Sequence, residues 1–149
     1  MSEKTIWFDM DGTIANLYGI EKWKESLDSF DPMPYIKAQP LINMNLLARY
    51  LNKLQKKGYK ICIVSWLSKV SNDTYNKLVT EAKNKWLKKH LSSVSFNQID
   101  IIPYGTPKEK GRKGILFDDE LRNRTAWGEG AHDVNNILEV LKKILNEVK

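Results

Sequence analysis

The stretch Thr5–Thr13, which reads TIWFDMDGT, joins an apolar run to two carboxylates, a glycine and a hydroxyl. A short apolar run that ends at a turn signal is typical of a buried β-strand. Asp9 and Asp11 follow this run with i, i+2 spacing, so both carboxylates point to the same side of the chain. Ligands of open α/β sheets bind outside the carboxyl ends of the strands. The stretch therefore predicts an acidic site at one edge of a sheet.

The two carboxylates suggest a specific chemistry. A carboxylate held at a strand end can attack phosphorus and form an aspartyl-phosphate, while a second one serves as acid and base. Two other interpretations exist for the same residues. Asp and Gly favour ordinary turns for local backbone reasons. Asp-x-Asp-Gly also opens calcium-binding loops, but Ala15 and Leu17 lack the side-chain oxygens that such loops use further on.

The length and composition favour a globular protein. A chain of 149 residues is expected to form one domain, residues 1–149, with a sizeable core. No apolar run approaches the roughly 20 residues that span a bilayer, and the first residues show no signal-peptide pattern. The single cysteine, Cys62, excludes an intramolecular disulfide and lies in an apolar run, where we expect it to be buried. These features predict a cytoplasmic protein without a membrane partner.

The net charge of +6 favours anionic partners. Three groups of cations supply much of it: Lys53, Lys56 and Lys57; Lys83, Lys85, Lys88 and Lys89; and Lys108, Lys110, Arg112 and Lys113. The first two groups lie near predicted helix ends, where cations are common and are expected to be solvated, with nucleic acid as a less favoured partner. The third group lies in a predicted loop close to the proposed site.

Strand and helix signals alternate along the chain, which predicts a parallel sheet with helical crossovers. The predicted strands are residues 4–9, 59–65, 99–102 and 114–117, and the predicted helices are residues 41–57, 71–89 and 134–148. We therefore expect a Rossmann-like, three-layer α/β/α fold. Residues 16–40 interrupt the alternation with many aromatic residues and three prolines, and they begin just after the two acids. They predict a short cap insert over the site.

Three more features fall where a phosphoryl-transfer site would need them. Ser65 ends the second predicted strand, where its hydroxyl could bind a phosphoryl oxygen or act as a helix cap or turn residue. The pair Asp118–Asp119 ends the strand 114–117. Adjacent carboxylates repel each other, and a hard cation would relieve the repulsion, whereas a helix N-cap needs only one acid. Lys108 could neutralise Asp9 and a bound phosphoryl group, or be one more surface lysine.

The order of these features resembles the haloacid dehalogenase-like (HAD) phosphohydrolase superfamily. Its four motifs are similar to residues 9–13 (DMDGT), Ser65, Lys108 and Asp118–Asp119. Within the superfamily the chain looks most like the 5′(3′)-deoxyribonucleotidase group. The resemblance implies Mg²⁺, an Asp9 nucleophile, an Asp11 acid/base and hydrolysis of a nucleoside monophosphate. Mg²⁺ would be held by Asp9, the Asp11 backbone carbonyl and the acidic pair, while Ser65 and Lys108 would bind phosphoryl oxygens.

The chain also departs from that group. Its insert is shorter than the helical cap, and Ser65–Trp66 stands where the group has a Thr-Ser-like pair. A small insert leaves an open site, which could admit a nucleic-acid end or be closed by a partner subunit. We expect Trp66 and Tyr18 to contact substrate, and some of Tyr18, Phe30 and Tyr35 to face the opening. The alternative functions are a nucleic-acid end phosphatase, a sugar-phosphate phosphatase and a non-catalytic binding module.

Overall fold

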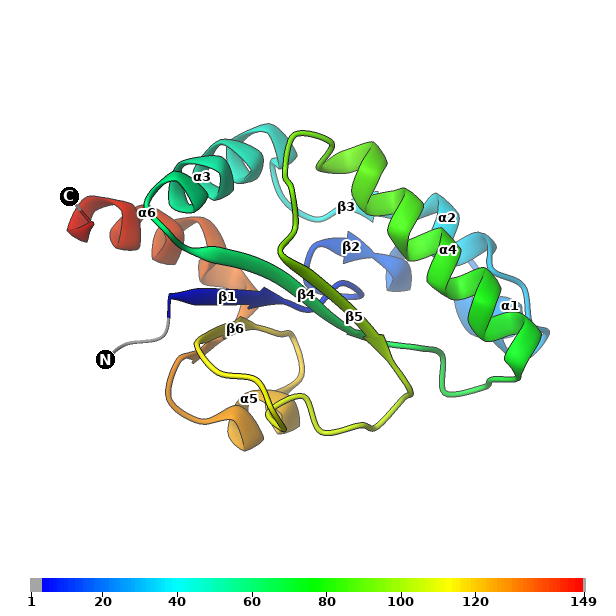
Figure 1. The fold of residues 1–149 in the computed structure, drawn as a ribbon. Coiled ribbons are helices and arrows are strands. Elements are labelled where there is room, and N and C mark those ends of the chain that lie inside the picture. The colour runs from blue at the N-terminus through cyan, green and yellow to red at the C-terminus, as the bar shows by residue number, and fades with distance from the viewer. Residues whose placement is uncertain (1–3, 149) are drawn as a thin grey trace.

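A parallel five-stranded sheet forms the centre of the computed structural model, which describes residues 4–148 (Figure 1). Its strands, in spatial order, are β5 (Gln98–Ile102), β4 (Lys60–Trp66), β1 (Thr5–Phe8), β6 (Ile115–Phe117) and β7 (Ala131–His132). The central strand β1 is parallel to both neighbours, with Phe8 opposite Ile63 on one side and Phe117 on the other. The carboxyl ends of β1, β4 and β6 therefore meet at one edge of the sheet.

Helices cover both faces of the sheet. The helices α3 (Met44–Lys56), α4 (Asp73–His90) and α6 (Ile137–Glu147) lie on one face, and the short α5 (Leu121–Trp127) lies on the other (Figure 1). Alternate residues of β1 explain the two cores. Ile6 and Phe8 pack with the buried residues of α3 and α6, whereas Trp7 packs with Leu116 and with Trp127 of α5. The expected Rossmann-like, three-layer α/β/α architecture is confirmed.

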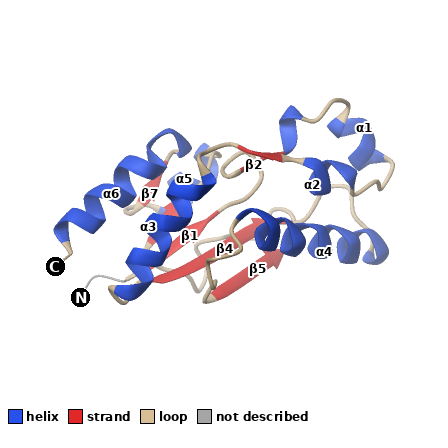
Figure 2. Cartoon of the chain, turned by 90° about the horizontal axis from the view of Figure 1, so that it is seen from above, coloured by secondary structure: helices blue, strands red, loops and turns tan. Residues whose placement is uncertain are grey.

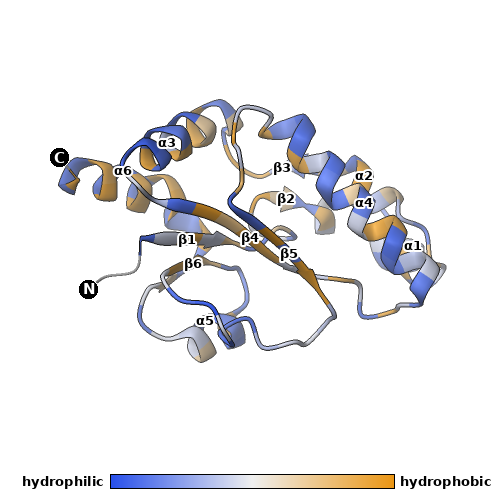
Figure 3. Cartoon of the chain, in the orientation of Figure 1, coloured by the Kyte–Doolittle hydropathy of each residue, from blue (hydrophilic) through white to orange (hydrophobic). Residues whose placement is uncertain are grey.

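The predicted elements match the observed ones closely where the apolar pattern is strong. The apolar stripes of α3 and α6 turn toward the sheet while their polar faces point outward (Figure 3). The sequence did not predict α5 or β7, because these elements have seven and two residues and lack a readable period. Cys62 is buried as predicted. Within residues 4–148, no helix is long and apolar enough to cross a membrane.

Residues 15–40 form a small lobe beside the sheet, which we call the insert. It contains β2 (Ala15–Asn16), a 3₁₀ turn η1 (Leu17–Gly19), α1 (Trp23–Asp28), α2 (Met33–Lys37) and β3 (Gln39–Pro40). The strands β2 and β3 pair antiparallel at its base. The insert packs on α4 (Figure 2), where Tyr35 and Leu27 meet Tyr75 and Val79 in a shared apolar cluster. A second 3₁₀ turn, η2 (Val134–Asn136), precedes α6.

Candidate active site

The loop after β1 folds back tightly at the carboxyl edge of the sheet. The backbone N–H of Asp9 donates to the carbonyl of Phe117 at 3.0 Å, and the N–H groups of residues 13–15 all donate to the Met10 carbonyl at 2.9–3.0 Å. Gly12 lies in the left-handed region with φ +80°, and a Cβ at this position would overlap the Asp119 carboxylate. The glycine is therefore required both by its backbone conformation and by the close approach of the second acidic segment.

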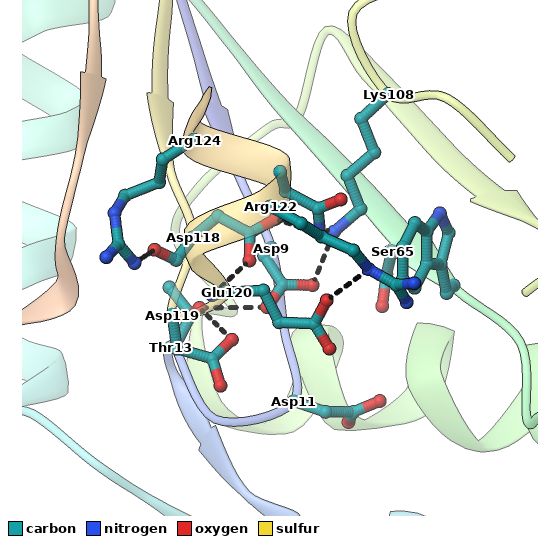
Figure 4. Close-up of polar contacts among 12 residues, drawn as sticks. Asp9, Asp11, Thr13, Ser65, Lys108, Asp118, Asp119, Glu120, Arg122 and Arg124 are labelled. Carbon is teal, nitrogen blue, oxygen red and sulfur yellow. Dashed lines mark hydrogen bonds and ion pairs between the residues drawn. The ribbon is translucent and has the colours of Figure 1, made fainter. Parts of the chain in front are cut away.

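Three carboxylates gather at this edge (Figure 4). Asp9, Asp118 and Asp119 each place one carboxylate oxygen so that the three oxygens lie within 4.8 Å of one another. Thr13 donates its hydroxyl to Asp9 Oδ2 at 2.9 Å. Lys108 Nζ lies 2.9 Å from Asp9 Oδ1 and 2.8 Å from Asp118 Oδ2, and its side chain is 2% exposed. The structure thus joins the ends of β1 and β6 with the loop between β5 and β6 in one charge cluster.

The crowding changes the acidity of each group. Burial raises the pKa of Asp119 to about 8 and that of Asp118 to about 6, and the nearby Asp9 carboxylate adds to both shifts. Burial would also raise the pKa of Asp9, but the Lys108 ammonium and hydrogen bonds from Asp119 and Lys108 lower it below its usual value. For Lys108, attraction to the carboxylates outweighs burial and raises the pKa. Asp9 is therefore held ionised beside a protonated lysine.

This donor set fits a hard divalent cation. Three carboxylates offer oxygen ligands of the kind that Mg²⁺ uses, and their mutual repulsion, visible in the raised pKa values of Asp118 and Asp119, would be relieved by a cation. The Asp11 carboxylate lies apart from the three clustered carboxylates (Figure 4). Its side chain is thus free for a role other than that of a metal ligand.

Asp11 has a partner that the sequence did not indicate. Lys83 Nζ donates to Asp11 Oδ2 at 2.8 Å, to Ser65 Oγ at 2.6 Å and to the Trp66 carbonyl at 2.8 Å. The expectation that Lys83 is solvated is wrong, because its side chain is 1% exposed. One signal could have found it: Lys83 lies four residues after Val79 and three before Trp86, on the buried stripe of α4. Burial raises the pKa of Asp11, and Lys83 opposes this shift.

Ser65 reaches the expected edge of the sheet, but its hydroxyl is fully buried. Its oxygen accepts the short hydrogen bond from Lys83, and Ser65 is not among the residues that line the neighbouring cavity. The structure therefore does not bring Ser65 to the cavity wall beside Asp9 and Lys108. Its contact with a phosphoryl oxygen stays a prediction, which would use the hydroxyl proton that Lys83 leaves free.

A cavity of about 510 Å³ opens from the acidic cluster toward the insert. Asp9, Asp11, Lys108, Asp118 and Asp119 lie at its acidic end. Most of its remaining wall is apolar or aromatic, with side chains from the insert, from the end of β4 and from the segment that follows β4: Leu17, Tyr18, Trp23, Leu27, Tyr35, Trp66, Leu67 and Val70. Polar side chains of the same segments, Lys24, Asp28, Ser68 and Lys69, also line it. The structure thus places Tyr18 and Trp66 on the cavity wall, and their contact with substrate stays a prediction. Tyr35 also faces the cavity, whereas Phe30 instead contacts Tyr75 at a ring distance of 5.6 Å.

Trp66 is held by a set of neighbours that sequence inspection missed. Its ring nitrogen donates to the Thr106 carbonyl at 2.8 Å, and its ring packs against Tyr104 with centroids 5.0 Å apart. The Arg122 guanidinium lies 4.7 Å from the ring centroid and Lys108 Nζ lies 5.1 Å from it. Trp66 therefore supports the loop that carries Lys108 and also forms part of the cavity wall.

The unpredicted helix α5 anchors Asp118, the first residue of the acidic pair. Asn123 donates to Asp118 Oδ2 at 3.1 Å, and Arg124 donates to the Asp118 carbonyl at 2.9 Å. The Glu120 N–H donates to Asp118 Oδ1 at 2.9 Å, as a turn-capping residue would require. Asp118 thus caps the turn before α5 and is also one of the three clustered carboxylates. The sequence did not indicate a role for Asn123, because that role depends on a helix that is too short to be predicted from its sequence pattern.

The lysines of the first cationic group lie away from the acidic cluster. Lys53, Lys56 and Lys57 line a separate groove with Lys142, at the ends of α3 and α6. The end of α3 leads into the start of β4, so this groove lies toward the amino ends of the strands, away from the acidic cavity. Among the third group, Lys108 is buried in the site, while Arg112 pairs with Asp100 at 2.8 Å.

Comparisons with known proteins support the fold. A scan against protein-family models gave no match, and neither did a search of curated protein sequences. A search of solved structures found five chains, among them D,D-heptose 1,7-bisphosphate phosphatase from Burkholderia thailandensis, with a TM-score of 0.58 and 14% sequence identity. The alignment covers 96% of this chain and 99% of that chain. Over nearly its whole length, the chain therefore shares the fold of a sugar bisphosphate phosphatase.

Proposed function

We propose that the protein is a phosphomonoester hydrolase that acts through an aspartyl-phosphate on Asp9. One observation carries the proposal: Asp9 forms an ion pair with Lys108 within a carboxylate cluster, at the acidic end of a cavity that Asp11 also lines. An ionised carboxylate is the form that attacks phosphorus. The fold shared with a phosphatase and the resemblance of the four motifs to HAD phosphohydrolases support the same chemistry.

The proposed reaction has two displacements. An Asp9 oxygen forms a bond to phosphorus as the bond from phosphorus to the leaving oxygen breaks, and Asp11 donates a proton to that oxygen. Asp11 then takes a proton from water, whose oxygen attacks phosphorus and releases Asp9 and inorganic phosphate. Lys108 remains protonated and offsets negative charge on the phosphoryl oxygens. The products are an alcohol and phosphate, and both residues return to their starting states.

We also propose that Mg²⁺ is the cofactor. Asp9, Asp118, Asp119 and the Asp11 backbone carbonyl would hold it, and when bound it would neutralise charge between the nucleophile and the phosphate. The pair Asp118–Asp119 has a further consequence for pH. Because both acids have raised pKa values in the metal-free protein, protons compete with the cation at these positions.

Mg²⁺ is expected to raise the melting temperature, and to do so more strongly as the pH rises from 6 to 8. The folded pKa values of Asp118 (about 6) and Asp119 (about 8) exceed the ordinary value of 3.8, so the metal-free protein loses stability as these acids ionise. Bound Mg²⁺ removes that loss. Its affinity should increase about tenfold per pH unit between pH 6 and 8, where one proton must leave, and level off above pH 8. Thermal shift titrations would measure this.

The variant Asp118→Asn/Asp119→Asn should remove the Mg²⁺-dependent rise in melting temperature. The matched control is Glu139→Gln/Glu147→Gln, which makes the same chemical change on the exposed face of α6. The control should keep the full effect of Mg²⁺. A rise that persists in the Asp118/Asp119 variant would place the metal elsewhere.

For the substrate, we propose a nucleoside monophosphate. The cavity has an acidic end for the phosphoryl group and a larger aromatic part that includes Tyr18, Tyr35 and Trp66, which suits a planar base. The sugar bisphosphate substrate named for the structural neighbour makes a sugar phosphate the second candidate. A nucleic-acid end is a third candidate. Its phosphates would need basic surface near the cavity; Lys24 and Lys69 line the cavity, whereas the groove with Lys53 and Lys142 lies toward the other end of the sheet.

A substrate panel tests the proposed function. Release of phosphate would be measured with Mg²⁺ on p-nitrophenyl phosphate, nucleoside monophosphates, sugar phosphates and 3′- or 5′-phosphorylated oligonucleotides. Highest kcat/KM on nucleoside monophosphates would support the proposal. Highest kcat/KM on oligonucleotides, with a steep loss at high salt, would favour an end phosphatase. Absence of Mg²⁺-dependent release from every compound would favour a binding module.

Trp66→Ala is expected to raise KM for a nucleoside monophosphate about tenfold or more. Stacking on a base contributes roughly 1–3 kcal/mol, and 1.4 kcal/mol corresponds to a factor of ten. KM for glycerol phosphate, which has no ring, should barely change. Because Trp66 also packs against Lys108, the variant Trp66→Phe serves as the control that keeps an aromatic ring. It should retain most of the nucleotide affinity, and an equal KM increase for both substrates would make Trp66 structural.

A further inference from the structure

Lys83 is a buried cation that the proposed reaction does not use directly. It is not among the residues that line the cavity, and its side chain is 1% exposed. All three of its hydrogen bonds go to groups of the site edge: the carboxylate of Asp11, the hydroxyl of Ser65 and the carbonyl of Trp66. A lysine ammonium has three donors and no acceptor, so its hydrogen-bonding capacity is completely satisfied in this arrangement.

These contacts join three parts of the fold. Lys83 comes from α4, Ser65 and Trp66 end β4, and Asp11 lies in the loop after β1. The ammonium also lies 5.1 Å from the ring centroid of Tyr35, which belongs to α2 of the insert. The position of the Asp11 carboxylate is therefore fixed relative to the sheet edge and to the insert by one side chain.

We infer that Lys83 is the positioning residue for Asp11: it acts on catalysis by holding the Asp11 carboxylate where protons are exchanged with the leaving oxygen and with water. This inference rests on the proposed function and adds a residue to it. Proton transfer requires heavy atoms within hydrogen-bond reach, and a misplacement of about 1 Å can cost roughly 10²-fold in rate. Lys83 does not touch the substrate, so its loss should act on kcat and leave KM nearly unchanged.

The inference is tested by a double-mutant cycle with Lys83→Met and Asp11→Asn. In the wild-type background, Lys83→Met should lower kcat for an alkyl phosphate by about 10–100-fold, with less effect on p-nitrophenyl phosphate, whose leaving group needs little protonation. In the Asp11→Asn background the same change should lower kcat less than about threefold, because the group that Lys83 positions has lost its function. A merely structural role would lower kcat by the same factor in both backgrounds.

Two further variants keep the test decisive. Lys83→Gln retains amide donors and should recover part of the activity that Lys83→Met loses; it replaces Lys83→Met in the cycle if the methionine variant does not fold. Lys85→Met, an exposed position on the same helix, should match the wild type. Equal losses in the two Asp11 backgrounds, equal losses on the two substrates, or a raised KM with unchanged kcat would each overturn the inference. A wild-type protein without Mg²⁺-dependent turnover would instead refute the proposed function. In that case, unaltered melting of Lys83→Met would also count against the inference.

Discussion

Asp9→Asn is expected to abolish phosphate release from every phosphomonoester while the protein stays folded. The amide cannot attack phosphorus, so the loss should be at least about 10⁴-fold, as expected when a catalytic nucleophile is removed. Stability should change little. Lys108 keeps its ion pair with Asp118, and the loss of the Asp9 charge relieves the repulsion that raises the pKa of Asp118 and Asp119. Steady-state assays and thermal melts would measure both effects.

The identity of the nucleophile can be observed directly. A crystal structure of the wild type with Mg²⁺ and beryllium fluoride or aluminium fluoride should show the phosphoryl analogue bonded to a carboxylate oxygen of Asp9. The matched control is Glu81→Gln, which replaces an exposed carboxylate of α4 by an amide and should retain full activity. Turnover of Asp9→Asn near the wild-type level, or an analogue bonded to another residue, would refute the mechanism.

Asp11→Asn is the second large expected effect, with a loss of roughly 10²–10⁴-fold in kcat on an alkyl phosphate, which is the usual contribution of proton transfer. The amide oxygen can still accept from Lys83, and burial already raises the pKa of Asp11 and so disfavours its charge, so we expect little change in the free energy of unfolding. The fold should survive, because Lys83 keeps its bonds to Ser65 and to the Trp66 carbonyl.

The leaving group separates an acid role from a merely structural one. p-Nitrophenolate leaves without a proton, so Asp11→Asn should reduce the release of p-nitrophenol much less than the cleavage of an alkyl phosphate. Comparison of kcat across phosphate esters with leaving groups of increasing pKa would show a steeper dependence in the variant than in the wild type. Parallel dependences in the two proteins would contradict the acid role of Asp11.

The sequence by itself determined the central strand and the main helices of this protein. The apolar run that ends in DMDGT predicted a central strand with acids at its carboxyl end, and β1 occupies that place. The amphipathic patterns predicted α3, α4 and α6 within a few residues. These features were readable because they depend on periods of two or 3.6 residues and on turn chemistry, which act over short distances along the chain. The order of strand-end residues then predicted that Asp9, Lys108 and the acidic pair would meet.

Only the tertiary structure decided the partners of these residues. Lys83 and Asp11 are 72 residues apart, and their contact depends on how α4 packs over the end of β4. The residues that flank a buried lysine in the sequence do not differ in kind from those that flank a solvated one. The one local difference is that the buried lysine lies on the apolar stripe of its helix. The short α5, which holds Asp118, and the arginine over Trp66 also lacked a local signal. Contacts of this kind are set by burial and strand order, because charges must find partners wherever water is excluded.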